Sequence, residues 1–246
     1  TVATLTRLER SLDEPVEETE IGKMILMKAG NERVRRAVVE GDVSGMSAVR
    51  GFPDVNTAGG THRLLDLVDR IEGGYVGYVV GDMGSGKTDF ALLLAELRSR
   101  VSDVTVATNV ESVTEKDEYI CRFDELDEWV TSDGEKLFIF DEASSHASGY
   151  GSDAGQVTGK LRQLLRSFRK NRASLLIVGH TGKDVHPDVR RLATDIIRKE
   201  SKTEARVYDD VDDDGRGEDV KMRLSGIEKT AWSYDTHEMS EWYWSS

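Results

Sequence analysis

The chain has 246 residues, of which 46 are acidic and 33 basic, so its formal net charge is −13. One cysteine, Cys121, excludes an internal disulfide framework and is typical of a reducing compartment. No apolar stretch reaches the roughly 18 residues of a membrane span, and residues 1–15 lack the apolar segment of a secretion signal. An acidic balance argues against nucleic-acid binding in general. It is also typical of proteins that stay soluble at high salt, so we expect a halophilic source.

Residues 1–60 are expected to form an N-terminal extension that is partly helical, and its last ten residues, 51–60, have the composition of a loop. Thr61 is then expected to cap a helix whose apolar residues share one broad face. Gly73 and Gly74 are expected to end that helix. The main domain is therefore predicted to begin at residue 61.

A phosphate-binding motif comes next. Residues 75–80 are an apolar, β-branched run typical of a buried strand, and residues 90–100 are typical of a helix. Between them the chain matches G-x-x-x-x-G-K-[ST] with Gly81, Asp82, Met83, Gly84, Ser85, Gly86, Lys87 and Thr88. Such a loop points backbone N–H groups at phosphate oxygens, and the helix N-terminus adds partial positive charge. We expect these eight residues to bind ATP, with Lys87 at the β- and γ-phosphates and Thr88 on Mg²⁺.

Two more strands are expected at residues 103–109 and 137–144, with a helix closing at Gly134 between them. The second strand ends in two carboxylates. We expect Asp141 to hold the Mg²⁺ shell and Glu142 to polarise the attacking water. Neighbouring carboxylates differ from the Asp-x-x-Gly of GTPase switches, so adenine is the expected base.

An amphipathic helix is expected within residues 155–172, because apolar residues recur at i, i+3, i+4 and i+7. These residues are Leu161, Leu164, Leu165 and Phe168. Residues 160–172 include six basic residues and no acid. Three interpretations stay open: a solvated face, a DNA channel, or an arginine that reaches the nucleotide of a neighbouring subunit. The arginine candidates are Arg169 and Arg172, with Arg190 or Arg191 further along.

Residues 173–181 predict a further buried strand. In the architecture that a P-loop implies, this strand would lie between the phosphate-loop strand and the strand ending at Asp141. His180 at its tip would face the γ-phosphate or the attacking water, or would be an ordinary surface histidine. The other histidines, His237 among them, show no metal-ligand spacing and are interpreted as plain surface residues. With a further strand at residues 195–199, the alternation of elements predicts a mostly parallel sheet covered by helices on both faces.

Residues 205–246 differ in character. Two strand-like segments flank an acidic, glycine-containing turn and predict a β-hairpin. Residues 210–215 match the first half of a calcium loop, but Lys221 stands where the bidentate Glu is needed, so a solvated turn is the better interpretation. The tail ends in Trp242, Tyr243 and Trp244, which we expect to pack on the body or on a neighbouring subunit rather than on nucleic-acid bases.

Taken in order, GDMGSGKT, VTVATNV, LFIFDEAS, the basic helix and LLIVGHTGKDVHPDVRRL resemble the FtsK–HerA superfamily of P-loop ATPases. VATNV is similar to the Zot-like branch, and the compact length resembles viral genome-packaging ATPases. The match covers residues 75–200, about half the chain. Lys87 and Thr88 match the Walker A motif, and Asp141 and Glu142 match Walker B. His180 stands where the family usually has glutamine, although histidine can also donate a hydrogen bond.

The resemblance implies an α/β, RecA-like P-loop NTPase core at residues 61–204, followed by the hairpin and aromatic tail. It implies a ring of subunits, often a hexamer, with ATP at the interfaces, arginines acting in trans and a pore that moves double-stranded DNA. The expected partners are further copies of the chain, double-stranded DNA and a capsid or portal vertex, in the host cytoplasm or the virion. Two alternatives stay open: a Zot-like ATPase that acts on coat proteins, and a RecA/KaiC-type switch without motor activity.

Overall fold

A single β-sheet runs through the molecule. The computed structural model describes residues 55–141, 154–180, 192–211 and 217–244. The strands in them are β1 Val76–Gly81, β2 Thr105–Thr108, β3 Glu118–Tyr119, β4 Lys136–Phe140, β5 Ser174–Val178, β6 Asp195–Lys199, β7 Glu204–Val211 and β8 Gly217–Ser225. The helices are α4 Val55–Arg70, α5 Lys87–Val101, α6 Phe123–Thr131 and α8 Ala154–Lys170. None of these helices is long and apolar enough to cross a membrane.

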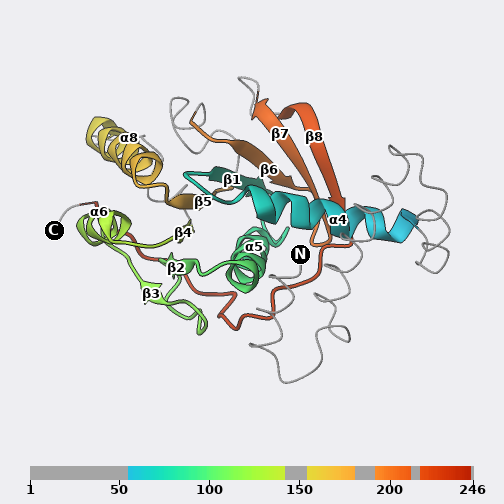
Figure 1. Ribbon diagram of the computed structural model, residues 1–246, viewed down its shortest axis with the longest axis horizontal. Coiled ribbons are helices and arrows are strands. Elements are labelled where there is room, and N and C mark those ends of the chain that lie inside the picture. Colours follow the sequence, from blue (N-terminus) through green and yellow to red (C-terminus); the bar gives the residue numbers. More distant parts are fainter. Residues whose placement is uncertain (1–54, 142–153, 181–191, 212–216, 245–246) are drawn as a thin grey trace, which may run out of the picture.

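The strand order is β3-β2-β4-β5-β1-β6-β7-β8 (Figure 1). All pairs from β3 to β6 are parallel, and β6–β7 and β7–β8 are antiparallel. This confirms the predicted mostly parallel α/β sheet and the C-terminal hairpin, which continues the same sheet. It also confirms that β5 lies between β1 and β4. Because these strands are parallel, the residues at their carboxyl ends meet at one edge.

Helices cover both faces of the sheet, as predicted. The core on one face joins α4 and α5 to strand residues such as Val79 and Ile139, and the core on the other joins α6 and α8 to residues such as Tyr78 and Phe138. Neighbouring residues of one strand enter opposite cores because side chains alternate along a strand. All residues of β1, β4 and β5 are buried, which is typical of parallel strands covered on both sides.

Helix α8 presents the apolar stripe that its sequence predicts. Leu161, Leu164, Leu165 and Phe168 are all buried in the core that α8 shares with α6. The basic residues Arg166, Arg169, Lys170 and Arg172 at its C-terminal end are exposed.

Helix α4 begins earlier than the sequence suggests. It starts at Val55, so the prediction that Thr61 caps it is wrong, and so is the loop assignment for residues 55–60. Two adjacent glycines lower helix propensity by about 1 kcal/mol each, but propensity is a weak guide where tertiary packing holds the helix. The C-terminal half of α4 supplies that packing, since Leu67 and Val68 are fully buried. Residues 1–54 lie outside the described part of the chain.

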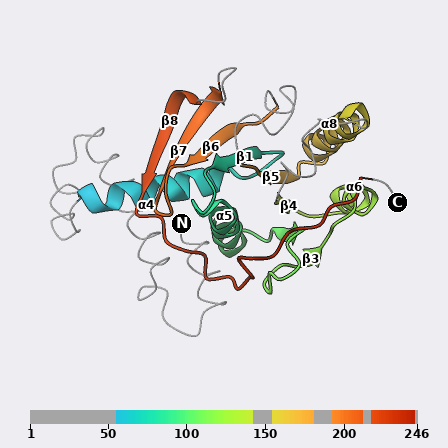
Figure 2. The ribbon, with the colours of Figure 1, turned by 180° about the vertical axis from the view of Figure 1, so that it is seen from behind.

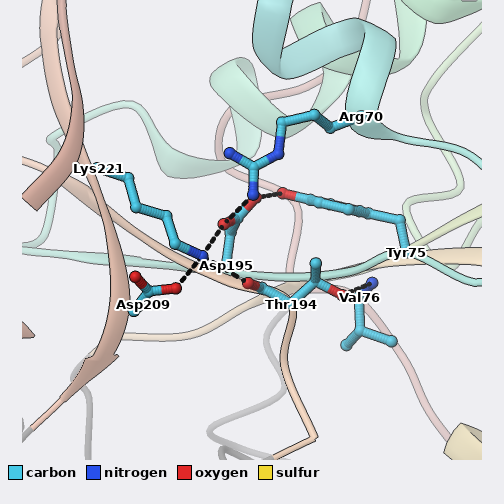
Figure 3. Close-up of polar contacts among 7 residues, drawn as sticks. All are labelled: Arg70, Tyr75, Val76, Thr194, Asp195, Asp209 and Lys221. Atoms are coloured by element: carbon cyan, nitrogen blue, oxygen red, sulfur yellow. Dashed lines mark hydrogen bonds and ion pairs between the residues drawn. The ribbon is translucent and has the colours of Figure 1, made fainter. Parts of the chain in front are cut away.

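A charge cluster around the buried Asp195 fixes the amino ends of β1 and β6 (Figure 3). Asp195 is fully buried and accepts hydrogen bonds from Arg70 (2.8 Å), the Tyr75 hydroxyl (2.9 Å) and Lys221 (3.1 Å). Lys221 also pairs with Asp209 on β7. Burial, and then the charge of Asp195, raise the pKa of Tyr75 well above its usual range, so the phenol stays a donor. The cluster ties α4, β1, β6 and β8 together at the end of the sheet opposite the phosphate loop.

After β8 the chain returns across the molecule as an irregular segment, residues 229–244, which we call the C-terminal belt. In Figures 1 and 2 it is the red segment that passes α5 and ends beside α6. The Ala231 N–H donates to Glu96 of α5 (2.8 Å), and the Tyr243 N–H donates to the Cys121 carbonyl (2.8 Å). Between these contacts, Glu241 accepts a hydrogen bond from Asn109, which follows β2, and Ser240 lies beside Asp141, which follows β4. This part of the belt therefore runs along the carboxyl edge of the central strands.

At the end of the belt Trp242 and Trp244 pack on the body of the protein, as predicted, while Tyr243 is 49% exposed. Trp242 is buried, with its ring centroid 4.8 Å from Phe140, 6.0 Å from Phe138 and 5.5 Å from Trp244. These contacts lie against β4, the strand that leads to Asp141. The predicted solvated turn of the β7–β8 hairpin falls on residues 212–216, outside the described residues.

Candidate nucleotide-binding site

The phosphate loop, residues 81–88, joins the end of β1 to the start of α5 as the sequence predicts. Lys87 donates from Nζ to the Asp82 carbonyl (3.1 Å) across the loop. Gly86 has φ 80°, a left-handed conformation that favours glycine. Its carbonyl accepts a hydrogen bond from the Phe90 N–H (3.0 Å), which is an i to i−4 bond at the start of α5. A Cβ on Gly81 would lie 2.5 Å from the Lys199 carbonyl, so only glycine lets the loop pass this close to β6.

Thr88 and Asp141 meet beneath the loop. The Thr88 hydroxyl donates to Oδ1 of Asp141 at 3.1 Å and lies 3.3 Å from Oδ2. The Ser240 hydroxyl of the belt lies 3.4 Å from Oδ2 on the other side. A hydroxyl and a carboxylate are the hard oxygen donors that suit Mg²⁺. With only two protein oxygens, such an ion would also take ligands from phosphate and water, as Mg²⁺ usually does.

Asn109, the residue after β2, fixes the backbone of Asp141. Its amide oxygen accepts the Asp141 N–H (2.7 Å), and its amide nitrogen donates to the Asp141 carbonyl (3.1 Å) and to the Glu241 carbonyl (3.3 Å). Asn109 is fully buried. It therefore holds the ends of β2 and β4 and the belt together, and sets where the Asp141 carboxylate lies.

A cavity of about 540 Å³ opens beside the loop. Its lining residues are Gly84, Gly86, Lys87, Thr88, Asp89, Lys202, Lys229, Tyr234, Thr236 and His237. The first five belong to the loop and α5, Lys202 belongs to the β6–β7 turn, and the last four belong to the belt. The volume falls within the range of about 300–1,000 Å³ that small-molecule sites occupy.

Asp89 joins the belt to the first turn of α5. Its carboxylate accepts the Thr230 N–H (3.4 Å) and the Tyr234 hydroxyl (3.5 Å). Burial raises the pKa of Asp89. Burial and the neighbouring Asp89 charge raise the pKa of Tyr234 to about 12, so the phenol keeps its proton into the alkaline range.

The structure brings some of the predicted site residues together and separates others. The whole phosphate loop and Asp141 lie at one edge, with His180 beside them: its carbonyl accepts the Gly81 N–H (3.3 Å), and its side chain is exposed. Glu142 is the first residue beyond the described range that ends at Asp141. Arg169 and Arg172 precede β5, at the opposite end of that strand from His180. Arg169 donates to the Leu192 carbonyl (2.6 Å).

Sequence reasoning missed Asn109 and the residues of the belt. A signal for Asn109 was present, since a polar residue closes the apolar strand VTVAT beside the expected Asp141 strand. His237 was interpreted as a plain surface residue, but it lines the cavity. The belt gave no local signal, because Tyr234 and Asp89 are 145 residues apart in the chain.

The strand order, the phosphate loop and the Thr88–Asp141 pair define a P-loop NTPase fold of the RecA-like kind. No profile of a known protein family and no curated protein matches the chain. Similar solved structures include the N-terminal domain of zonular occludens toxin from Neisseria meningitidis (18% identity, TM-score 0.43, covering 57% of this chain and 86% of that one). Another is B204, the DNA-packaging ATPase of Sulfolobus turreted icosahedral virus (15% identity, TM-score 0.41, covering 55% of this chain and 92% of that one).

A third is the EssC fragment with ATPases 2 and 3 from Geobacillus thermodenitrificans (10% identity, TM-score 0.47, covering 69% of this chain and 41% of that one). The toxin domain and the packaging ATPase are of the kinds that the sequence resemblance named. At these identities and TM-scores the likeness concerns the fold. The function of this chain must therefore be inferred from its own site.

Proposed function

We propose that the protein hydrolyses ATP and that copies of it form a ring that moves double-stranded DNA, in the packaging of a viral genome. The observation that carries the ATPase part is the contact between Thr88 and Asp141 at 3.1 Å, directly beneath a glycine loop that ends in Lys87. Phosphate-binding backbone, an ammonium group and a hard-oxygen pair for Mg²⁺ thus lie within one edge of the sheet.

The residues of the loop and those around it would each have a separate role in ATP hydrolysis. The Lys87 ammonium, which contacts the Asp82 carbonyl, would exchange that oxygen for those of the β- and γ-phosphates. Thr88 and Asp141 would hold Mg²⁺, which when bound neutralises charge that develops on the phosphates. Glu142, next to the anchored Asp141, would orient the attacking water, and His180 would donate a hydrogen bond to the γ-phosphate.

The basic end of α8 supports the DNA part of the proposal. Arg166, Lys170 and Arg172 are exposed there, while Lys160, on an earlier turn, contacts the Trp244 carbonyl and lies over the ring of Phe123. These residues put several exposed positive charges within seven positions of an acidic protein, and a phosphate backbone would be attracted to such charges. Because Arg169 and Arg172 lie at the far end of β5 from the loop of their own subunit, the proposed arginine finger would act on a neighbouring subunit.

The proposal is tested by measuring ATP hydrolysis with and without double-stranded DNA over a salt titration. We expect DNA to stimulate turnover and to bind less tightly as salt rises, because binding releases counterions. The double variant Arg166→Gln/Lys170→Gln should lose the stimulation and keep basal turnover. Arg223→Gln, an exposed arginine on β8, is the matched control and should keep both. Hydrolysis that DNA does not change, together with no DNA binding at any salt, would overturn the motor assignment.

The ring is tested separately by measuring native mass with and without ATP and Mg²⁺. A closed ring, expected to be a hexamer, supports the motor. A monomer or dimer under both conditions would contradict it and would favour an ATP-controlled switch.

A further inference from the structure

The cavity beside the phosphate loop is lined by Lys202 of the β6–β7 turn and by two larger walls that are far apart in the sequence. One wall is the loop and the first turn of α5, which the proposed function already uses. The other wall is formed by Tyr234, Thr236 and His237 of the C-terminal belt, with Lys229 at its start. The chemistry of ATP hydrolysis at the loop does not require this second wall.

We propose that residues 234–237 of the belt bind the nucleoside part of the nucleotide whose phosphates the loop holds, with the Tyr234 ring as the platform for the base. This inference rests on the proposed nucleotide binding at the loop and extends it to the residues that recognise the base and the ribose.

The chemistry of the belt wall suits a nucleoside better than further phosphate. An aromatic ring offers a stacking surface to any base, and stacking tolerates different bases because each has a π face. The Thr236 hydroxyl and the His237 imidazole can each donate and accept hydrogen bonds, as ribose hydroxyls and base edges require. Lys202 and Lys229 line the same cavity, and their positive charge suits the phosphate end of the ligand.

The cavity is also large enough. A volume of about 540 Å³ exceeds what three phosphates need and leaves room beside the loop for a base and a sugar. Because α5 begins at Lys87, phosphates on the helix N-terminus would place the nucleoside beside the first turn, where Asp89 and the belt lie.

Carboxylates hold the belt in place on both sides of residues 234–237. On one side Glu96 accepts the Thr230 hydroxyl (2.7 Å) and the Ala231 N–H (2.8 Å). On the other side the Glu238 carboxylate accepts the N–H groups of Glu111 (2.6 Å) and Ser112 (3.0 Å). A segment anchored at both ends loses little conformational freedom when a ligand binds, so the belt wall is organised in advance.

The test compares the binding of ATP with that of inorganic tripolyphosphate, measured by calorimetry on the full chain with Mg²⁺. Tyr234→Leu keeps apolar volume and removes the ring. We expect it to weaken ATP binding by about tenfold or more and to change tripolyphosphate binding by less than about twofold. Tyr234→Phe should bind both ligands like the unaltered protein, and so should Met239→Leu, a control on the same belt at a side chain that is 78% exposed.

His237→Ala gives a second readout at an exposed residue, and the same selective loss of ATP binding is expected. If Tyr234→Leu and His237→Ala both bind ATP normally, or lose ATP and tripolyphosphate equally, the inference is wrong. Failure of the underlying function looks different: the unaltered protein would then bind neither ligand, or Lys87→Ala would bind both as well as the unaltered protein does.

Discussion

The side chain of Asn109 makes hydrogen bonds to both the N–H and the carbonyl of Asp141, at 2.7 and 3.1 Å. The two residues stand at the ends of different strands, β2 and β4, and both are buried. An asparagine amide has a donor and an acceptor side by side, so it can replace a stretch of sheet pairing where the strands have ended. Asn109 is thus the residue that places the proposed metal-binding carboxylate.

Asn109→Ala should therefore weaken both stability and metal use. It leaves a buried backbone donor and acceptor unpaired, so we expect the free energy of unfolding to fall by about 1–3 kcal/mol. The Mg²⁺ concentration for half-maximal ATP turnover should rise, because Asp141 is no longer fixed. Urea denaturation and a Mg²⁺ titration of turnover measure the two effects. Asn171→Ala, which removes a bond to the Ser167 carbonyl (2.9 Å) at the far end of α8, should leave the Mg²⁺ dependence unchanged.

Glu142→Gln and Lys87→Ala should separate hydrolysis from binding. The first keeps size and hydrogen bonding and removes only the base, so ATP should bind normally while turnover stops. The second removes the ammonium that is proposed to contact the phosphates, so ATP binding itself should be lost. Equilibrium binding and single-turnover hydrolysis distinguish them. Equal loss of binding and turnover in Glu142→Gln would contradict the role given to Glu142, and unchanged affinity in Lys87→Ala would refute the phosphate-loop assignment.

Trp242→Ala should strongly destabilise the protein. The indole is 5% exposed and contacts the rings of Phe138 and Phe140, so its removal leaves a large cavity and should cost about 3–5 kcal/mol. Trp242→Phe should cost much less, because the indole N–H has no hydrogen-bond partner within the described residues. Chemical denaturation of the three proteins measures the difference. Equal stability of the Ala and Phe variants would show that the aromatic packing does not hold the belt.

Lys199 should give the protein a measurable pH dependence of stability. Burial lowers the pKa of this lysine to about 8, and Asp89 opposes the shift. The unfolded chain, with a lysine pKa of about 10.4, therefore binds more protons than the folded protein between about pH 8 and pH 10. The unfolding free energy contributed by Lys199 must then rise with pH across that window.

Lys199→Met should remove this rise, because the buried charge is absent in both states. Urea denaturation at about pH 7, 9 and 10 gives the unfolding free energy of the unaltered protein and of the variant, and the difference between the two should change with pH. Lys170→Met, at an exposed position on α8, should keep the rise. If the unfolding free energies of the unaltered protein and Lys199→Met differ by the same amount at every pH, the lowered pKa of Lys199 is contradicted.

Most of the central sheet could be predicted from the sequence because its strands are short, mainly apolar runs that are followed by polar residues. β1, β4 and β5 are such runs, and the position of β5 between β1 and β4 was expected from the architecture that the phosphate loop implies. The start of α4 could not be predicted, because two glycines and a threonine look like a loop and a cap until the packing of Leu67 and Val68 is known. The aromatic tail was correctly expected to pack, but nothing local indicated that Trp242 would lie against Phe140.

By itself the sequence determined the phosphate loop and the acid beneath it, since each depends on a few adjacent residues at the end of an apolar strand. Only the tertiary structure decided how that loop is enclosed. The belt reaches the loop, Asp89 and Asp141 from about a hundred residues or more further along the chain, after the hairpin has turned it back across the sheet edge. A contact of this kind depends on the path of the whole chain, so no local pattern in residues 229–244 records it.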